Sequence, residues 1–282
     1  MSYRIVSDSS SNLLEYKGNQ NYITVPLKIM VDGVEFVDEK GLDTSALVNA
    51  FEHSTKDSTS CPNAGEWLDA FAGVDEVYAV TISSNLSGSY ASCVMATEQL
   101  QAEHPEVKVH VFDSKATGGS MQLIIEKIEE CKEAGMSFED TVSTVEEYYK
   151  HTKILFLLES LGNLSKNGRV NPAVAKVASF LGIRFLGKAS EEGTIQQASI
   201  ARGAKKAFST LLNEILKSGY NGGKLRLSHC LNPDQAHKIK DELLAKFPDA
   251  DIVVDNCTGL CSYYAERGGM IVCFEIDNGN ST

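Results

Sequence analysis

The chain has 282 residues, of which 43% are hydrophobic and 23% are charged, and its formal net charge is -12. A chain of this length can bury a sizeable core and is long enough for two domains. The acidic balance argues against a general binder of nucleic acid or of an anionic membrane, since such binders need clustered Lys and Arg.

The amino terminus, MSYRIVSDSS, begins directly with a strand-like pattern, and no basic segment followed by an apolar one predicts a secretory signal. No apolar run approaches the roughly 20 residues needed to cross a bilayer. Seven scattered cysteines suit a reducing compartment better than a disulfide framework. We therefore expect a cytoplasmic protein without stable membrane insertion.

The first half of the sequence alternates strand-like and helix-like segments. Asp32-Gly33 predicts a tight hairpin turn, and residues 54–63 are expected to form a polar loop. This alternation predicts a parallel sheet with helices on both faces. The expected strands are residues 3–6, 22–30, 34–37, 77–82 and 107–112. The expected helices are residues 44–53, 65–71, a segment starting at Tyr90, 118–134 and 138–151.

The second half has strands and helices in a less regular order, which predicts an α+β domain with a mixed or antiparallel sheet. Loops are expected over residues 161–170 and 256–262. The whole chain is thus predicted to be an α/β protein of two domains, residues 1–152 and 153–282. The expected strands are residues 154–158, 183–186, 196–199, 224–229, 252–255 and 270–275, and the expected helices are 173–181, 203–218 and 234–247.

Small polar residues recur at four predicted strand exits, namely residues 7–11, 58–60, 83–89 and 113–114. Ligands of parallel α/β sheets bind beyond the carboxyl ends of the strands. The loop 83–89 also leads into a helix, whose first N–H groups favour an anion. It carries no charged residue, so it offers neutral hydrogen bonds. The simpler alternative is that Ser87 only caps the helix.

The sequence lacks the motifs of several common catalytic, metal-binding and nucleotide-binding sites. It has no H-E-x-x-H zinc motif, no G-x-S-x-G nucleophile elbow, no Walker A loop and no dinucleotide fingerprint. Cys257 and Cys261 lack the further ligands of a structural zinc site, so neither a metal nor a cofactor is expected. Basic residues in the second half form either a solvated face or a docking patch for an acidic partner. They are Lys166, Arg169, Lys176, Arg202, Lys205 and Lys206.

Six segments of the sequence, taken in order and spacing, form a specific set. They are IVSDSSSNL (5–13), TSCPNAGEW (59–67), ISSNLSGSY (82–90), VFDSKATGG (111–119), LGNLSKNGRV (161–170) and ARGAKKA (201–207). Together they resemble the DegV family of bacterial fatty-acid-binding proteins, and the resemblance covers nearly the whole chain. The resemblance implies two domains with a long-chain fatty acid between them, whose carboxylate is held by Thr59 and Ser84. Ser60, Ser87, Gly88 and Cys257 become possible neighbours of the head group.

The resemblance also implies a role. Family members serve as the lipid-presenting subunit of fatty acid kinase, and a partner kinase phosphorylates the bound carboxylate to supply phospholipid synthesis. The chain itself would then be a carrier with no catalytic residue. Arg169 and Arg202 would face the kinase.

The sequence departs from the family pattern near the expected head group. Residues 61–63 read Cys-Pro-Asn where Gln-Pro-Ser is usual, and residues 257–261 read CTGLC where His-x-Gly-Pro-Gly is typical. A thiol is a weak donor, so weaker or rearranged head-group contacts are expected. Two alternatives stay open: an acyl- or phosphoryl-group enzyme using Ser84 or Cys257, and a lipid sensor without a kinase.

Overall fold

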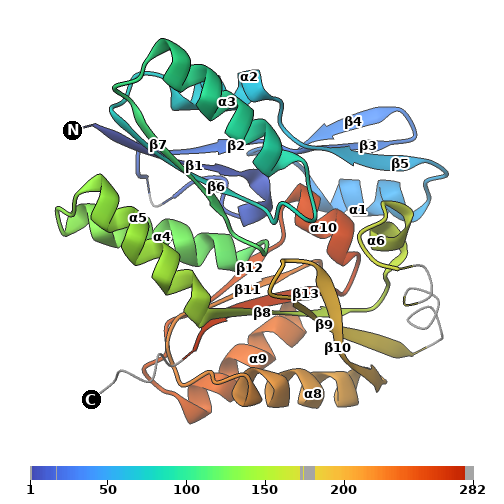
Figure 1. Ribbon diagram of the computed structural model, residues 1–282. Coiled ribbons are helices and arrows are strands. Elements are labelled where there is room, and N and C mark those ends of the chain that lie inside the picture. Colours follow the sequence, from blue (N-terminus) through green and yellow to red (C-terminus); the bar gives the residue numbers. More distant parts are fainter. Residues whose placement is uncertain (1, 17, 172–173, 175–181, 277–282) are drawn as a thin grey trace.

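The structure, a computed structural model, describes residues 2–16, 18–171, 174 and 182–276 (Figure 1). Its first sheet is parallel and has the strand order β2-β1-β6-β7. Every residue of β6 is buried, as expected for a central strand covered on both faces. The strands are β1 (Tyr3–Asp8), β2 (Tyr22–Val25), β6 (Glu76–Thr81) and β7 (Lys108–Asp113).

Helices cover both faces of this parallel sheet, which confirms the prediction for the first half (Figure 1). On one face lie α2 (Ala64–Phe71) and α3 (Ser89–Glu103). On the other lie α4 (Gly119–Glu133) and α5 (Phe138–Tyr148).

A small antiparallel sheet extends from this unit in the order β4-β3-β5, with α1 (Thr44–Glu52) nearby (Figure 1). Asp32 and Gly33 both have positive φ, 46° and 87°, which confirms the predicted hairpin turn. The strands are β3 (Lys28–Val31), β4 (Val34–Val37) and β5 (Asp57–Ser60).

Two predictions for this region were wrong. The single strand expected over residues 22–30 is interrupted at Pro26, because proline has no N–H for a ladder, and its two parts join different sheets. The expected polar loop 54–63 contains β5, which pairs with β3. Its sequence, DSTS, carries no apolar alternation, so the strand depends on a partner about thirty residues away.

The second half forms a six-stranded mixed sheet, in the order β10-β9-β8-β13-β11-β12, as predicted. Helices α8 (Ala204–Lys217) and α9 (Pro233–Lys246) cover one face (Figure 1). The other face packs on α4, which therefore lies between the two large sheets. The strands are β8 (Thr152–Leu158), β9 (Ile183–Ala189), β10 (Ile195–Arg202), β11 (Leu225–His229), β12 (Ile252–Asn256) and β13 (Met270–Glu275).

Two short helices occupy segments that were predicted to be loops, α6 (Gly162–Lys166) and α10 (Gly259–Ala265). Asp38 accepts the N–H groups of Gly259 (2.6 Å) and Leu260 (2.9 Å), so α10 begins on a carboxylate from the other half of the chain. No pattern in the neighbouring sequence predicts that a helix begins at Gly259. The helix expected over residues 173–181 lies, apart from Val174, outside the described residues.

The division into domains at residues 152 and 153 stays a prediction; it falls where the short helix η2 (Tyr149–His151) passes into β8. A buried ion pair joins the two halves, between Arg226 and Glu126. Arg226 of β11 donates from Nε and Nη2 to Glu126 of α4, at 2.8 and 2.7 Å, and from Nη2 to Asp251 at 2.7 Å. None of the helices within the described residues has the length and apolar character to span a bilayer.

Candidate functional site

A cavity of about 250 Å³ lies where the two halves of the chain meet. Its wall is mainly apolar, as is typical of a site for a small apolar molecule, and it is built from segments far apart in the sequence. Representative apolar wall residues are Leu27, Ile82, Phe156, Leu158, Leu260 and Ile271.

A group of polar residues interrupts this apolar wall. Thr59 and Ser60 come from β5, and Ser87 and Gly88 come from the loop after β6. The sulfur of Cys61 lies 3.2 Å from where a Cβ on Gly88 would stand, so the two segments adjoin. The structure therefore brings together four of the residues that the sequence singled out.

Arg169 adds a positive charge beside these hydroxyls. It lines the cavity, and its Nε donates to the carbonyl oxygen of Leu86 at 2.8 Å. A second nitrogen donates to the carbonyl oxygen of Asn167. Arg202, the other arginine singled out by the sequence, is exposed at the end of β10 and does not line the cavity.

The loop 83–88 joins strand and helix as predicted, with α3 beginning at Ser89 rather than Tyr90. Gly88 occupies the N-cap position and offers no side chain for capping. Ser87 Oγ accepts the N–H of Ser89 at 3.2 Å. No hydrogen bond donated by its hydroxyl is found among the described residues, and Ser87 lines the cavity.

Ser84 lies apart from this group. It is exposed, and its hydroxyl donates to Asp113 Oδ2 at 2.6 Å while its N–H donates to Asp113 Oδ1 at 3.1 Å. It is not part of the cavity wall. No histidine bonds to Ser84 in the described part of the chain, and the partner of its hydroxyl is the carboxylate of Asp113.

Cys257 is also outside the cavity wall, with 1% of its surface exposed. Burial raises its pKa well above the ordinary value. Cys261, one turn further along, does line the cavity, and burial raises its pKa to about 12. Both thiols are protonated at neutral pH, which makes them poor nucleophiles. Sequence reasoning did not identify Cys261 as a wall residue.

Tyr264 was also missed by the sequence analysis. Its hydroxyl hydrogen-bonds to Thr59 Oγ1 at 2.8 Å, across the cavity wall. The hydroxyl of the preceding residue, Tyr263, bonds to Asp57 at the start of β5. Helix α10 thereby contacts β5 at two successive tyrosines.

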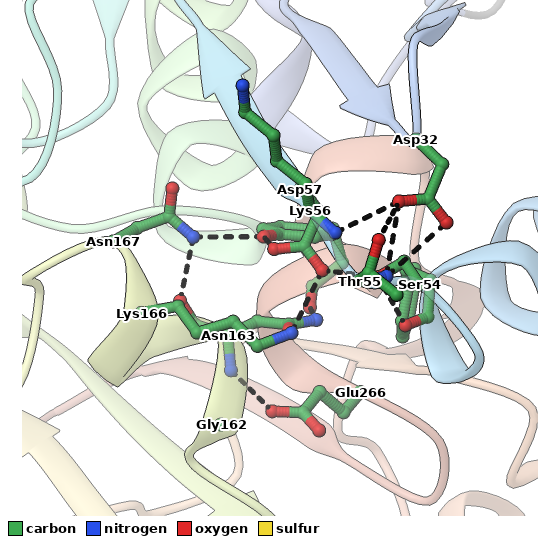
Figure 2. Close-up of polar contacts among 12 residues, drawn as sticks. Asp32, Ser54, Thr55, Lys56, Asp57, Gly162, Asn163, Lys166, Asn167 and Glu266 are labelled. Carbon is green, nitrogen blue, oxygen red and sulfur yellow. Dashed lines mark hydrogen bonds and ion pairs between the residues drawn. The ribbon is translucent and has the colours of Figure 1, made fainter.

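Asp57 is the centre of a polar cluster, and its side chain is fully buried. It accepts hydrogen bonds from Ser54 Oγ (2.7 Å), Tyr263 OH (2.7 Å) and Lys166 Nζ (3.0 Å) (Figure 2). Burial by itself raises the pKa of Asp57, but these donors outweigh it and hold the pKa below its ordinary value. One carboxylate thus links the start of β5 with α6 and α10.

Helix α6 is held to α10 by further hydrogen bonds (Figure 2). Asn163 N–H donates to Glu266 Oε1 at 2.9 Å, and Asn167 Nδ2 donates to Tyr263 OH at 2.9 Å. This docking places Leu164 in the cavity wall and directs the following turn, with Arg169, toward the loop 83–88. Among the described residues, no cluster of His, Cys, Asp or Glu is arranged to hold a metal.

Comparison with known proteins identifies the family. The family model described as "uncharacterised protein, DegV family" matches residues 2–276. The chain belongs to the DegV family. A DegV domain-containing protein of Streptococcus pyogenes serotype M1 is 38% identical to it over 280 residues, which cover 98% of this chain and 100% of the relative.

Two solved structures are similar over nearly the whole chain. A DegV family protein from Eubacterium eligens, loaded with heptadecanoic acid, is 39% identical, with a TM-score of 0.94 over 98% of this chain and all of the other. The fatty acid kinase B3 protein of Streptococcus pneumoniae, loaded with linoleic acid, is 35% identical, with a TM-score of 0.96 over the same shares. Both the resemblance read from the motifs and the predicted fold class are therefore confirmed.

Proposed function

We propose that this DegV protein binds one long-chain fatty acid in the cavity between its two halves and acts as a carrier, not as an enzyme. The observation that carries the proposal is the cavity itself, an apolar enclosure with one group of hydroxyls beside an arginine. Each buried methylene contributes roughly 0.8 kcal/mol, so the apolar wall supplies the affinity. Two similar DegV structures are loaded with heptadecanoic acid and with linoleic acid.

The carboxylate would be held by the polar group of the wall. Thr59 and Ser87 offer hydroxyls, with Ser60 and the backbone of Gly88 beside them. Hydrogen bonds to a charged group are stronger than those between neutral groups. Arg169 supplies positive charge and has no carboxylate partner among the described residues. The resemblance assigns Ser84 to the carboxylate as well, which requires its hydroxyl to leave Asp113.

The carrier would present the carboxylate to a partner kinase. A carboxylate oxygen then attacks the terminal phosphorus of the kinase-bound nucleotide, the nucleoside diphosphate leaves, and an acyl phosphate forms. Support comes from the resemblance and from the similarity to a protein named as the B3 protein of a fatty acid kinase. Arg202, exposed on β10, and Arg169 are the proposed contacts with the kinase.

Native mass spectrometry of the purified protein, followed by analysis of its organic extract, tests the binding. We expect one equivalent of long-chain fatty acid, and uptake of hexadecanoic acid by delipidated protein. If neither purified nor delipidated protein holds a fatty acid, the carrier proposal is wrong.

Presentation needs a separate test with a bacterial fatty acid kinase as the phosphoryl donor. We expect Arg202→Glu to reduce acyl-phosphate formation while leaving the Kd for hexadecanoic acid within twofold. The charge reversal Lys246→Glu, on α9, serves as the control. Equal acyl-phosphate formation by Arg202→Glu and the wild type would remove Arg202 from the docking surface.

A further inference from the structure

The turn after β1 is polar and completely buried. Residues 7–11, with the sequence SDSSS, are each 0% exposed, and Ser9–Ser11 form the short helix η1. None of them lines the cavity. Its contacts nevertheless reach the cavity wall: Ser9 Oγ accepts the N–H of Leu27 (3.0 Å), and the carbonyl oxygen of Ser10 accepts the hydroxyl of Thr117 (3.2 Å).

Asp8 connects this turn to the loop that contributes Ser87 and Gly88 to the cavity. Its Oδ2 accepts the N–H of Ile82 at 3.0 Å and the hydroxyl of Ser89 at 2.6 Å. Ile82 directly precedes the loop 83–88, and Ser89 directly follows it. One carboxylate oxygen therefore holds both ends of the loop.

The other oxygen of Asp8 fixes the carboxylate itself. Oδ1 accepts the N–H of Ser10 at 3.2 Å and also its hydroxyl. No cation pairs with Asp8 within the described residues, although it is 0% exposed. Burial raises the pKa of Asp8, and the hydrogen bonds from Ser10, Ser89 and Ile82 oppose that rise. A buried carboxylate is costly unless such donors satisfy it.

We propose that Asp8 is a positioning residue for the fatty-acid head group: by holding Ile82 and Ser89 on one oxygen, it sets the loop that presents Ser87 and Gly88 to the ligand carboxylate. The inference rests on the proposed function. An asparagine fills the same space but has only one oxygen, so its amide N–H must face either the N–H of Ser10 or that of Ile82. The hydrogen bond from either Ser10 N–H or Ile82 N–H is then lost.

The test compares two ligands that share an acyl chain and differ in the head group. Kd values for hexadecanoic acid and for 1-hexadecanol are measured with wild-type protein, Asp8→Asn and Ser89→Ala. We expect Asp8→Asn to weaken acid binding about tenfold and alcohol binding less than twofold, because the loop serves the head group. Ser89→Ala keeps the Asp8 carboxylate and removes only its hydrogen bond from Ser89, so we expect a smaller loss of affinity, confined to the acid. This variant still tests the proposal if Asp8→Asn does not fold.

The control is Glu76→Gln, which alters a buried carboxylate at the opposite end of β6, bonded to Lys132 and Tyr78. It is expected to lower Tm and to leave the ratio of the two Kd values unchanged. Equal weakening of acid and alcohol by Asp8→Asn and Ser89→Ala, or no change in either, overturns the positioning role. Failure of the wild type to bind hexadecanoic acid is a different result, which overturns the proposed function instead.

Discussion

Thr59 of β5 and Tyr264 of α10 share a hydrogen bond of 2.8 Å between their hydroxyls, although they are 205 residues apart. Both line the cavity. The bond joins a strand from the small sheet of the first half to a helix from the second half. The candidate head-group site therefore exists only when both halves of the chain are folded and in contact.

Removing the Thr59 hydroxyl is expected to weaken fatty-acid binding. Thr59→Val keeps the β-branched shape and should raise the Kd for hexadecanoic acid by roughly 5- to 150-fold, since a hydrogen bond to a charged group contributes about 1–3 kcal/mol. Isothermal titration calorimetry checks this. Tyr264→Phe removes the 2.8 Å hydrogen bond between Tyr264 and Thr59 but leaves the Thr59 hydroxyl in place, so it should raise the Kd much less. Equal losses in the two variants would mean that Thr59 matters only through Tyr264.

The two serines of the loop are expected to differ. Ser87 lines the cavity, whereas Ser84 is exposed and bonded to Asp113. Ser87→Ala should raise the Kd for hexadecanoic acid about threefold to tenfold, and Ser84→Ala should change it less than twofold. A larger effect of Ser84→Ala would indicate that this hydroxyl turns from Asp113 to the ligand, as the family resemblance implies.

The free energy of unfolding should carry a pH dependence that comes from Asp38. Burial raises the pKa of this carboxyl from 3.8 to about 6, against the hydrogen bonds donated by Leu260 and Gly259. An acid whose pKa rises on folding takes up a proton on folding between these values. Its contribution to stability is therefore complete below pH 3.8 and is lost as the pH rises through 6. Between pH 7 and pH 5 the gain from this group is about 1 kcal/mol.

Urea unfolding at pH 5 and at pH 7, for wild type and Asp38→Asn, isolates that contribution. The variant should lack the gain of the wild type on acidification, although it is less stable overall because α10 loses part of its N-terminal support. The same pH dependence in both proteins would contradict the assignment to Asp38.

The buried ion pair between the two halves, Arg226 with Glu126, gives a prediction about stability. The Arg226 side chain is 6% exposed and bridges Glu126 and Asp251. Arg226→Ala leaves Glu126, itself 12% exposed, without its main cation and should cost about 3–5 kcal/mol. The double variant Arg226→Met with Glu126→Leu removes both charges and should recover most of that loss. If the double variant is as unstable as Arg226→Ala, packing rather than charge explains the effect.

Reducing the room in the cavity should discriminate between acyl chains by length. Ala265, on α10, lines the cavity and is 3% exposed. Ala265→Ile should weaken the binding of octadecanoic acid more than that of dodecanoic acid, because each methylene kept out of the apolar cavity loses roughly 0.8 kcal/mol of binding free energy. Ala96→Ile is the control, because Ala96 is equally buried in a separate core cluster. Equal losses for both acids would place Ala265 away from the acyl path.

Much of the fold followed from local sequence patterns. The alternation of apolar runs and amphipathic segments predicted the parallel sheet and its covering helices, and Asp32-Gly33 predicted the hairpin turn. The strand expected over residues 22–30 was wrong because Pro26 divides it into two strands of different sheets. The other segments that failed were β5, α6 and α10. Each is short and polar or glycine-containing, and each is held by distant partners: β5 by pairing with β3, and α10 by Asp38.

The sequence by itself determined the family, the two kinds of sheet and the position of a hydroxyl-rich loop beyond β6, because these depend on residue type and spacing along the chain. Only the tertiary structure decided which hydroxyl of that loop lines the cavity. Ser84 is turned outward by Asp113 and the loop ends are held by Asp8, through contacts 29, 74 and 81 residues apart in the sequence. The direction of a short polar side chain is set by where its hydrogen-bond partner lies, and that partner is brought near only by folding.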